Sequence, residues 1–232
     1  MTRSIALVVL ALVGCTSESP IVETSASTTM LLDASGTFLW VLSPDDDAMV
    51  EVSTRDGSEI ERVSMPGEPQ EIVSTGDELV ITIGRMGAVR VARADGSVTT
   101  LPVPCAWTRS AASLHGRTFV TCPDDDRVIE IDASVPRVVW TIEVPGEPTA
   151  IAIAGARLAV TTARGRSLVT FDLSASATNA PTPLETTLLP VDPMRSASQP
   201  AAIAPDPHGA FALVYQSVAN DGPRDLPASS GG

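Results

Sequence analysis

Two runs of three aspartates are the densest groups of chemically active side chains in this sequence. Each run follows a proline and precedes a Gly-Glu-Pro triplet further along; the carboxylates are Asp45, Asp46, Asp47 and Glu68, and then Asp124, Asp125, Asp126 and Glu147. Grouped carboxylates create a negative field that attracts cationic partners. Aspartate after proline is also ordinary turn chemistry, which is the simpler interpretation. Calcium is a third alternative, but the Asp-x-Asp-x-Asp-Gly spacing that wraps this ion is absent.

Other candidates for catalysis or metal binding are few. The two histidines precede glycine, in His115-Gly116 and His208-Gly209, and turn formation accounts for both pairs. Two histidines and three cysteines are too few soft ligands for a structural zinc site or a haem-attachment motif. We found no Gly-x-Ser-x-Gly, no phosphate-binding glycine loop and no carboxylate pair spaced for acid–base work. We therefore predict no catalytic residue, metal site or cofactor.

The first cysteine ends an N-terminal segment that has the order of a secretory signal. Arg3 precedes nine apolar residues, Ile5 to Val13, and Gly14-Cys15 follows them. Spanning a bilayer takes about 20 apolar residues, so this run suits a cleaved signal. The tetrapeptide Leu12-Val13-Gly14-Cys15 resembles the lipobox of bacterial lipoproteins. The resemblance implies cleavage before Cys15 and acylation of its thiol, which would fix the protein to a membrane.

The same resemblance implies a location and a domain order. Thr16, which is not acidic, usually goes with sorting to the outer membrane, so we expect a cell-envelope lipoprotein facing the periplasm or the cell surface. Residues 1–14 would be the signal peptide, and the mainly small, polar residues 15–28 the tether. Export also places Cys105 and Cys122 in an oxidising compartment. A disulfide between them is one alternative, and two buried thiols are the other.

The charge balance excludes one class of partner. The chain has 15 basic side chains, all arginine, against 28 acidic ones, which gives a net charge of −13 over 232 residues. Such a surface repels polyanions, so we expect no nucleic-acid binding. With 44% hydrophobic residues, the chain can still bury a sizeable core.

A repeat of about forty residues organises the rest of the chain. Residues 42–69 align without gaps on residues 121–148, at an offset of 79, with nine of 28 positions identical. An apolar-x-apolar strand recurs in steps of 39, 40 and 40 residues, at Val50, Val89, Ile129 and Val169. Each copy contains four short β-like runs separated by turn residues. A four-stranded repeat of this length is typical of a β-propeller blade.

The order of motifs within each copy resembles YVTN-type propeller repeats. The resemblance covers about residues 29–215 and is weakest where Cys105-Ala106-Trp107 replaces Gly-Glu-Pro. It implies an all-β fold, a propeller of four-stranded antiparallel blades. We place complete blades at about 29–68, 69–108, 109–147 and 148–199, and a partial fifth blade from Pro200. The propeller then occupies residues 29–216, and residues 217–232 are expected to be a flexible polar tail.

A partial fifth blade leaves the ring open. We favour an incomplete or truncated propeller, whose open edge at Phe211–Tyr215 is completed by a downstream domain or by another chain. A strained five-bladed ring, to which Ile21–Thr24 lends a strand, is the alternative. In either form, the loops after the second and fourth strands of a blade share one face. That face would carry both aspartate runs, Glu68, Glu147 and the Cys105–Cys122 pair, and it is the expected acidic binding rim.

The expected lipid anchor and the propeller repeat together predict a class of function and no specific ligand. We expect a lipid-anchored extracytoplasmic propeller that binds a protein or a small ligand and is not itself catalytic. YVTN-like propellers also resemble lactonases and quinoprotein- or cytochrome-linked oxidoreductases in shape, so the alternative is the N-terminal propeller of a larger enzyme.

Overall fold

The computed structural model of the protein describes residues 24–26, 28–76, 78–93, 96–174, 180–189 and 195–219. The expected signal peptide, Cys15 and the tail beyond residue 219 lie outside these residues. The described chain consists of strands, connecting turns and three short 3₁₀ helices, η1 (Pro44–Asp46), η2 (Gly84–Met86) and η3 (Pro123–Asp125). No helix in this part of the chain is long and apolar enough to cross a membrane.

Four sheets, each containing four consecutive antiparallel strands, form most of the structure, and β1 (Thr24–Ala26) adds a fifth strand to one of them. Blade 1 consists of β2 (Met30–Leu32), β3 (Phe38–Ser43), β4 (Ala48–Ser53) and β5 (Glu59–Ser64). Blade 2 consists of β6 (Pro69–Ser74), β7 (Glu78–Ile83), β8 (Ala88–Arg93) and β9 (Val98–Pro102). Blade 3 consists of β10 (Ala111–Leu114), β11 (Arg117–Cys122), β12 (Arg127–Asp132) and β13 (Arg137–Glu143). Blade 4 consists of β14 (Pro148–Ala154), β15 (Arg157–Thr162), β16 (Ser167–Asp172) and β17 (Thr182–Leu188).

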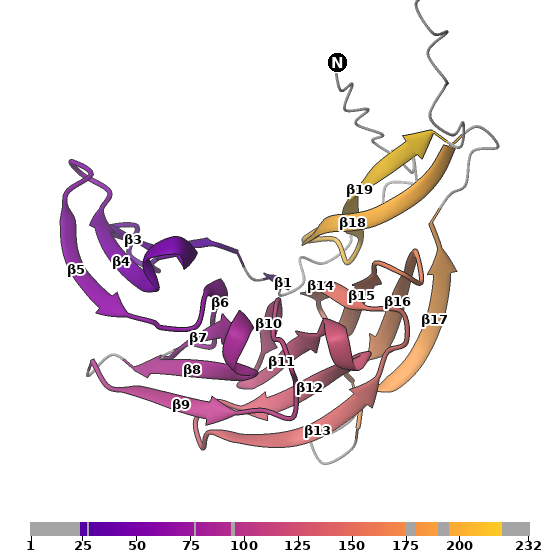
Figure 1. Ribbon diagram of the computed structural model, residues 1–232, viewed down its shortest axis with the longest axis horizontal. Helices are drawn as coiled ribbons and strands as arrows, with labels where there is room; N and C mark the ends of the chain where they lie inside the picture. Colours follow the sequence, from indigo (N-terminus) through magenta and orange to yellow (C-terminus); the bar gives the residue numbers. More distant parts are fainter. Residues whose placement is uncertain are drawn as a thin grey trace, which may run out of the picture.

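The blades stand around a common centre, so the predicted all-β propeller is confirmed (Figure 1). A fifth, partial blade is the hairpin of β18 (Arg195–Pro205) and β19 (Phe211–Ala219). Blade 1 and this hairpin lie at the two ends of an arc that is open between them in Figure 1. Among the described residues, β19 pairs only with β18. The expected tail therefore begins later than residue 217, because β19 extends to Ala219.

Apolar side chains on both faces of the inner blades explain why the sheets stack. One cluster fills the interface between blades 1 and 2 and includes Met49, Ile72 and Ile81. A second joins blades 2 and 3, a third joins blades 3 and 4, and a smaller one packs β18 and β19 on blade 4. Burial of apolar surface between sheets contributes roughly 25 cal/mol per Å², so each interface stabilises both of its blades.

The strand register corrects one position of the predicted repeat. On the ladder between the second and third strands, Val50 pairs with Val41, Ile129 with Val120 and Val169 with Val160. The matching position in blade 2 is Arg90, which pairs with Ile81, and not Val89. A one-residue shift moves a side chain to the other face of a strand. Val89 accordingly packs in the cluster shared with blade 3, whereas the Arg90 guanidinium donates to Ser64 O of blade 1 at 3.0 Å.

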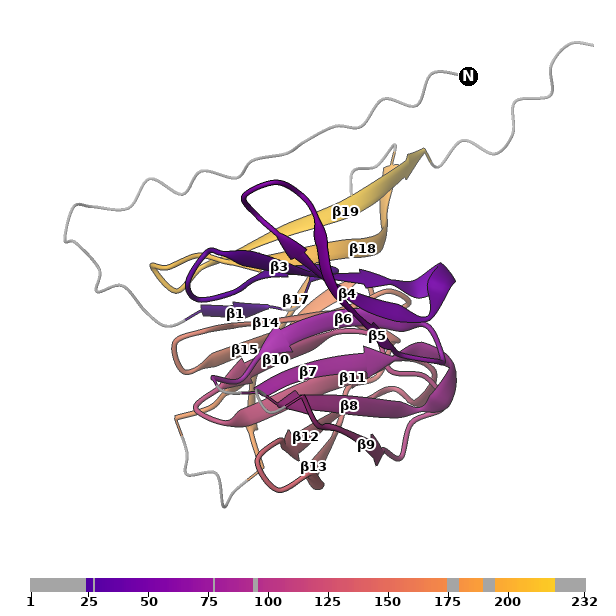
Figure 2. The ribbon, with the colours of Figure 1, turned by 90° about the vertical axis from the view of Figure 1, so that its left-hand side faces the viewer.

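The N-terminal strand lies inside the propeller. β1 (Thr24–Ala26) pairs antiparallel with β14, the inner strand of blade 4, and Thr28 forms a bridge with Ile72 of β6. Ser25 Oγ accepts a hydrogen bond from Ser113 N of β10 at 2.8 Å. Both views show β1 beside β14 (Figures 1 and 2). Residues 24–26 and 28, expected to be tether, thus belong to the fold and contact three blades. Thr24 pairs with blade 4 and does not add a strand to the fifth blade, as the alternative ring requires.

Candidate functional site

The expected acidic rim lies in the turns between the second and third strands and in the connectors between blades. Asp47 and Asp126 occupy the same place in blades 1 and 3, in the left-handed region at φ 50° and 52°. Asp126 Oδ1 accepts hydrogen bonds from Gly146 N and Glu147 N at 3.1 and 2.7 Å. Asp47 makes the equivalent pair of contacts with the blade 1–blade 2 connector. These two carboxylates therefore hold each turn against the following connector.

The other rim carboxylates are engaged in different ways. Glu68 and Glu147 form ion pairs with Arg85 and Arg164, which belong to the turn of the next blade. Asp46 Oδ2 accepts from Ser43 Oγ at 2.8 Å, and Asp125 Oδ2 accepts from Ala106 N at 2.6 Å. Asp45 and Asp124 are exposed, and neither forms a hydrogen bond or ion pair among the described residues. Arg85 and Arg164 neutralise part of the charge of this rim, so its field is weaker than its carboxylates alone suggest, and its binding role stays a prediction.

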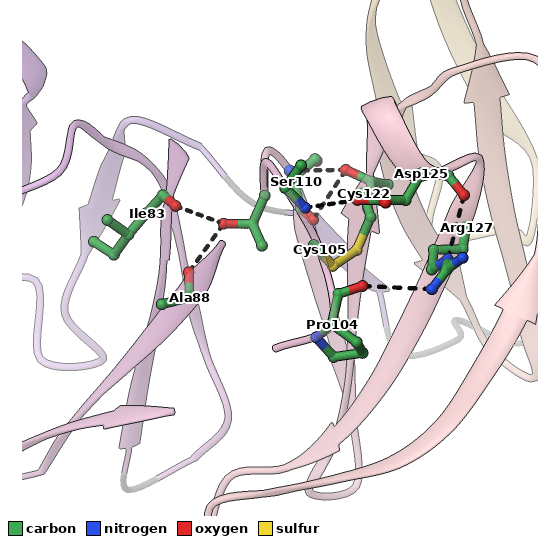
Figure 3. Close-up of a disulfide and its surroundings, with 11 residues drawn as sticks. Ile83, Ala88, Pro104, Cys105, Ser110, Cys122, Asp125 and Arg127 are labelled. Atoms are coloured by element: carbon green, nitrogen blue, oxygen red, sulfur yellow. Dashed lines mark hydrogen bonds between the residues drawn. A yellow bond between two sulfur atoms is a disulfide. The ribbon is translucent and has the colours of Figure 1, made fainter. Parts of the chain in front are cut away.

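A disulfide joins Cys105 and Cys122 at this rim, with a Cα–Cα distance of 5.6 Å (Figure 3). It lies where the blade 2–blade 3 connector departs from Gly-Glu-Pro, and it links this connector to the end of β11. Arg127 Nη1 donates to Pro104 O at 3.5 Å on one side of the bridge. On the other side, Thr108 Oγ1 lies 3.0 Å from the carbonyls of both Ile83 and Ala88. The bridge therefore ties the blade 2–blade 3 connector to the blade that follows it, as the Glu68–Arg85 and Glu147–Arg164 ion pairs do for the other connectors.

A cavity between blades 1 and 2 is the feature most suited to holding a ligand. Its volume is about 520 Å³, within the usual range of small-molecule sites. Apolar and aromatic side chains form most of its wall: Leu31, Phe38, Trp40, Met49, Val63 and Leu79. Three carboxylates line it as well, from Asp33, Glu51 and Glu61. No arginine or histidine is among the described residues that line it.

Strand pairing explains why these carboxylates face one cavity. Glu51 of β4 lies directly opposite Trp40 of β3 on one side and directly opposite Glu61 of β5 on the other. Directly opposed side chains share a face of the sheet, and like charges placed this way destabilise it. Asp33, in the turn after β2, lies at the edge of the same space.

The acids of the cavity differ in their pKa values. Partial burial raises the pKa of Glu51, and the nearby charges of Glu61 and Asp33 raise it further. Burial also raises the pKa of Asp33, but hydrogen bonds from Phe38 N, Ser35 and Thr37 outweigh this effect, so the pKa is lowered. Neither Glu51 nor Glu61 forms a hydrogen bond or an ion pair among the described residues. The cavity therefore holds negative charge that this part of the protein leaves unneutralised.

Blade 3 shows the same position with its charge satisfied. Glu130, which lies opposite Phe119, occupies the ladder position of Glu51. Arg117 Nε and Nη2 donate to the two oxygens of Glu130 at 2.8 and 3.0 Å, and the guanidinium lies 5.2 Å from the centre of the Phe119 ring. In blade 1, Phe38 takes the place of Arg117. This substitution removes the cation and leaves the cavity.

The acids of this cavity were not predicted as a site, because they are not adjacent in the sequence. Asp33, Glu51 and Glu61 lie on three different segments of blade 1, whereas the predicted rim consists of runs of neighbouring acids. The available signal was the repeat alignment itself, which places Glu51 over Glu130 but Phe38 over Arg117. Within the described ranges, no group of three or more histidine, cysteine or acidic residues is placed to hold a metal ion.

Comparisons with known proteins support the fold. No family model and no curated protein sequence matches the chain. Virginiamycin B lyase from Staphylococcus aureus is similar in structure, with a TM-score of 0.63, 16% identity, and coverage of 81% of this chain and 62% of that one. A protein of unknown function from Desulfotomaculum acetoxidans has a TM-score of 0.65 at 14% identity, with coverage of 81% and 62%.

Hydrazine synthase from Kuenenia stuttgartiensis is a third similar structure, with a TM-score of 0.63, 15% identity, and coverage of 78% of this chain and 53% of that one. At these identities the likeness is one of fold alone. The chain spans less than two thirds of the length of these three proteins.

Proposed function

We propose that the protein is a lipid-anchored β-propeller of the bacterial cell envelope that binds a small ligand between its first two blades. The cavity carries this proposal. It combines about 520 Å³ of space, an apolar and aromatic wall and a few convergent polar groups, which is the usual composition of a ligand site. The lipobox-like sequence ending at Cys15 supports the membrane attachment.

Filling the cavity tests the binding role. Ala92 lies on the wall that blade 2 contributes, so Ala92→Phe should occupy the space. Ala212→Phe makes the same change at an exposed position of β19 and is the matched control. A panel of small aromatic molecules should raise the melting temperature of the full-length protein and of the control, but not of Ala92→Phe. Shifts that persist in Ala92→Phe would place the binding elsewhere.

The anchor is tested separately. Cys15→Ser should release the protein from membranes and abolish labelling by a radioactive fatty acid, because the acylated thiol is lost. Unchanged membrane fractionation together with unchanged labelling would contradict the lipobox assignment.

An enzymatic role for a larger protein is the second candidate. It is favoured by the comparisons, in which the lyase and the synthase are enzymes with similar propellers. A reading frame that continues into further blades or a Cys-x-x-Cys-His segment would support it. The open ends of the arc would then receive further blades, which is also how we propose that the propeller is completed.

A further inference from the structure

We propose that the ligand of the cavity between blades 1 and 2 is an organic cation, an amine or guanidinium carried on an apolar or aromatic body. This inference rests on the proposed function and adds the chemical class of the ligand. It places the cationic group between the Glu51 carboxylate and the Trp40 ring, with Glu61 alongside, and the apolar body against Leu31, Val63 and Leu79.

The Arg117–Glu130 pair of blade 3 provides the model for this contact. There, a guanidinium donates two hydrogen bonds to a carboxylate and lies over the neighbouring aromatic ring. Blade 1 retains the carboxylate, as Glu51, and the ring, as Trp40, at the same ladder positions. Only the cation is missing, since Phe38 stands where Arg117 would be. A ligand cation would therefore restore an arrangement that the protein already builds once from its own side chains.

Charge complementarity favours a cation over other ligands. Among the described residues that line the cavity, the three titratable groups are all acidic, and those that blade 2 contributes, including Leu79, Ala92 and Val98, are uncharged. A cation between these carboxylates would also relieve the repulsion between Glu51 and Glu61 across the strands. Aromatic faces attract cations through their quadrupole, and tryptophan does so best. The rings of Phe38 and Trp40 pack in a T-shaped arrangement with 5.7 Å between their centres, which holds the tryptophan ring in place.

A matched set of probes separates charge from shape. Phenethylamine, 2-phenylethanol and 3-phenylpropionate share one aromatic body and carry a cationic, a neutral and an anionic end. We expect phenethylamine to bind the full-length protein at pH 7 at least ten-fold more tightly than the alcohol, and the acid not to bind, by isothermal titration calorimetry. Amine affinity should fall as the pH is lowered from 7 to 4, because the raised pKa of Glu51 makes this carboxylate take up a proton over that range.

Two variants and a control complete the test. Glu51→Gln should weaken amine binding at least ten-fold and flatten its pH dependence. Phe38→Arg should abolish amine binding, because the new guanidinium takes the place of the ligand, as in blade 3. Glu143→Gln removes an exposed carboxylate on β13, outside the cavity, and should leave binding unchanged.

The outcomes distinguish this inference from the proposed function. Equal affinity for amine and alcohol, with no effect of Glu51→Gln, would overturn the cation and leave a neutral-ligand site. Binding of calcium or magnesium that competes with the amine and exceeds it in affinity would also overturn the inference, in favour of a metal. Absence of binding by every aromatic probe, with Ala92→Phe behaving as the unmodified protein, would overturn both proposals.

Discussion

The side chain of Asp126 connects the turn after β11 with the connector between blades 3 and 4. Its Oδ1 atom accepts hydrogen bonds from Gly146 N and Glu147 N, while its own backbone is in the left-handed region. Aspartate tolerates this region better than most residues because its short polar side chain bonds locally. Asp126 and its equivalent Asp47 therefore have a structural role, which is to hold a turn against the following connector.

This role predicts a difference between two neighbouring aspartates. Asp126→Ala should lower the free energy of unfolding by about 2 kcal/mol, because two backbone N–H groups lose a charged acceptor. Alanine would also have to adopt the left-handed backbone conformation, which it tolerates less well than aspartate. Asp124→Ala, at an exposed position, should change it by less than about 0.5 kcal/mol. Urea denaturation measures both values. Equal losses in the two variants would contradict the role given to Asp126.

The Arg117–Glu130 ion pair is the second residue-scale case. The two side chains are 12% and 2% exposed, so each depends on the other for neutralisation. Arg117→Met should destabilise the protein by about 3–5 kcal/mol, because it leaves the Glu130 charge buried and unpaired.

The double variant Arg117→Met/Glu130→Leu should recover most of this loss, since an apolar pair of similar volume no longer carries a buried charge. A thermal denaturation cycle of the two single variants and the double variant measures the coupling. A double variant that is less stable than Arg117→Met would contradict this account.

At the scale of the element, an Asp-x-Ser turn recurs along the chain. It occurs at Asp33–Ser35, Asp56–Ser58, Asp132–Ser134 and Asp172–Ser174, and in each case the aspartate accepts a hydrogen bond from the serine two residues later. For Asp132, the Ser134 hydroxyl is the largest cause of a lowered pKa, and Val135 N adds to it. These turns close hairpins at one end of the blades.

The lowered pKa values predict how the protein responds to acid. A carboxyl group with a pKa lower in the folded than in the unfolded state contributes stability above its unfolded value, near 4, and loses it as the pH falls through the folded value. Stability should therefore fall as the pH drops below about 4. Asp132→Asn keeps an acceptor for the turn without a titrating group, so its loss over this range should be smaller. Denaturation at pH 7 and pH 3 compares the two proteins.

The disulfide is the second prediction at this scale. Cys105 and Cys122 enclose a separation of 17 residues, and closing a loop of this size stabilises a fold by about 3 kcal/mol in the chain-entropy model. The Cys105→Ser/Cys122→Ser variant should lose stability on that order. Thiol titration of the denatured, unreduced mature protein should find no reactive thiol, and two reactive thiols would refute the bridge.

Most of the strands could be predicted from the sequence, and the strands that were predicted wrongly have physical explanations. The strands of blade 3 follow from alternating apolar residues and an intact repeat, and the structure confirms the four-stranded sheet there. The register of blade 2 was predicted one residue off because Val89-Arg90-Val91 reproduces the apolar-x-apolar pattern one position before the true one, where Arg90 replaces the apolar residue. Arg90 lies at a position that is apolar in the three other blades. Its guanidinium is accommodated there because it donates a hydrogen bond to Ser64 O of blade 1.

Long-range contacts were the part that the sequence could not predict. Three residues of β1 carry no pattern that pairs them with Ala152–Ala154, and the cavity depends on side chains that approach one another only after blades 1 and 2 pack. The roles of the rim aspartates also depend on which backbone groups lie beside them. The turn interpretation of the Pro-Asp runs was the closer one, because η1 and η3 begin at those prolines.

At the scale of the whole molecule, β1 joins blades that are distant in sequence. Replacing residues 24–28 with glycine and serine removes the pairing with β14 and the bridge to Ile72. The inner edge of β14 would then lose its hydrogen-bond partners, at a cost of about 2 kcal/mol or more. Hydrogen exchange followed by mass spectrometry should show faster exchange in β14, with β12 changed much less. Unchanged exchange in β14 would contradict the pairing.

The place of β1 also sets an order of events during biogenesis. Thr24 pairs with Ala154, 130 positions further along the chain. In a polypeptide that is translocated from its N-terminus, the earliest residues to emerge must wait unpaired until three blades have followed them. Blades 1 to 3 would form from local hairpins first, and β1 would join last, when β14 arrives. The slow step in maturation would then be this late docking of β1. A chaperone that binds extended segments would have access to β1 for longer than to any blade.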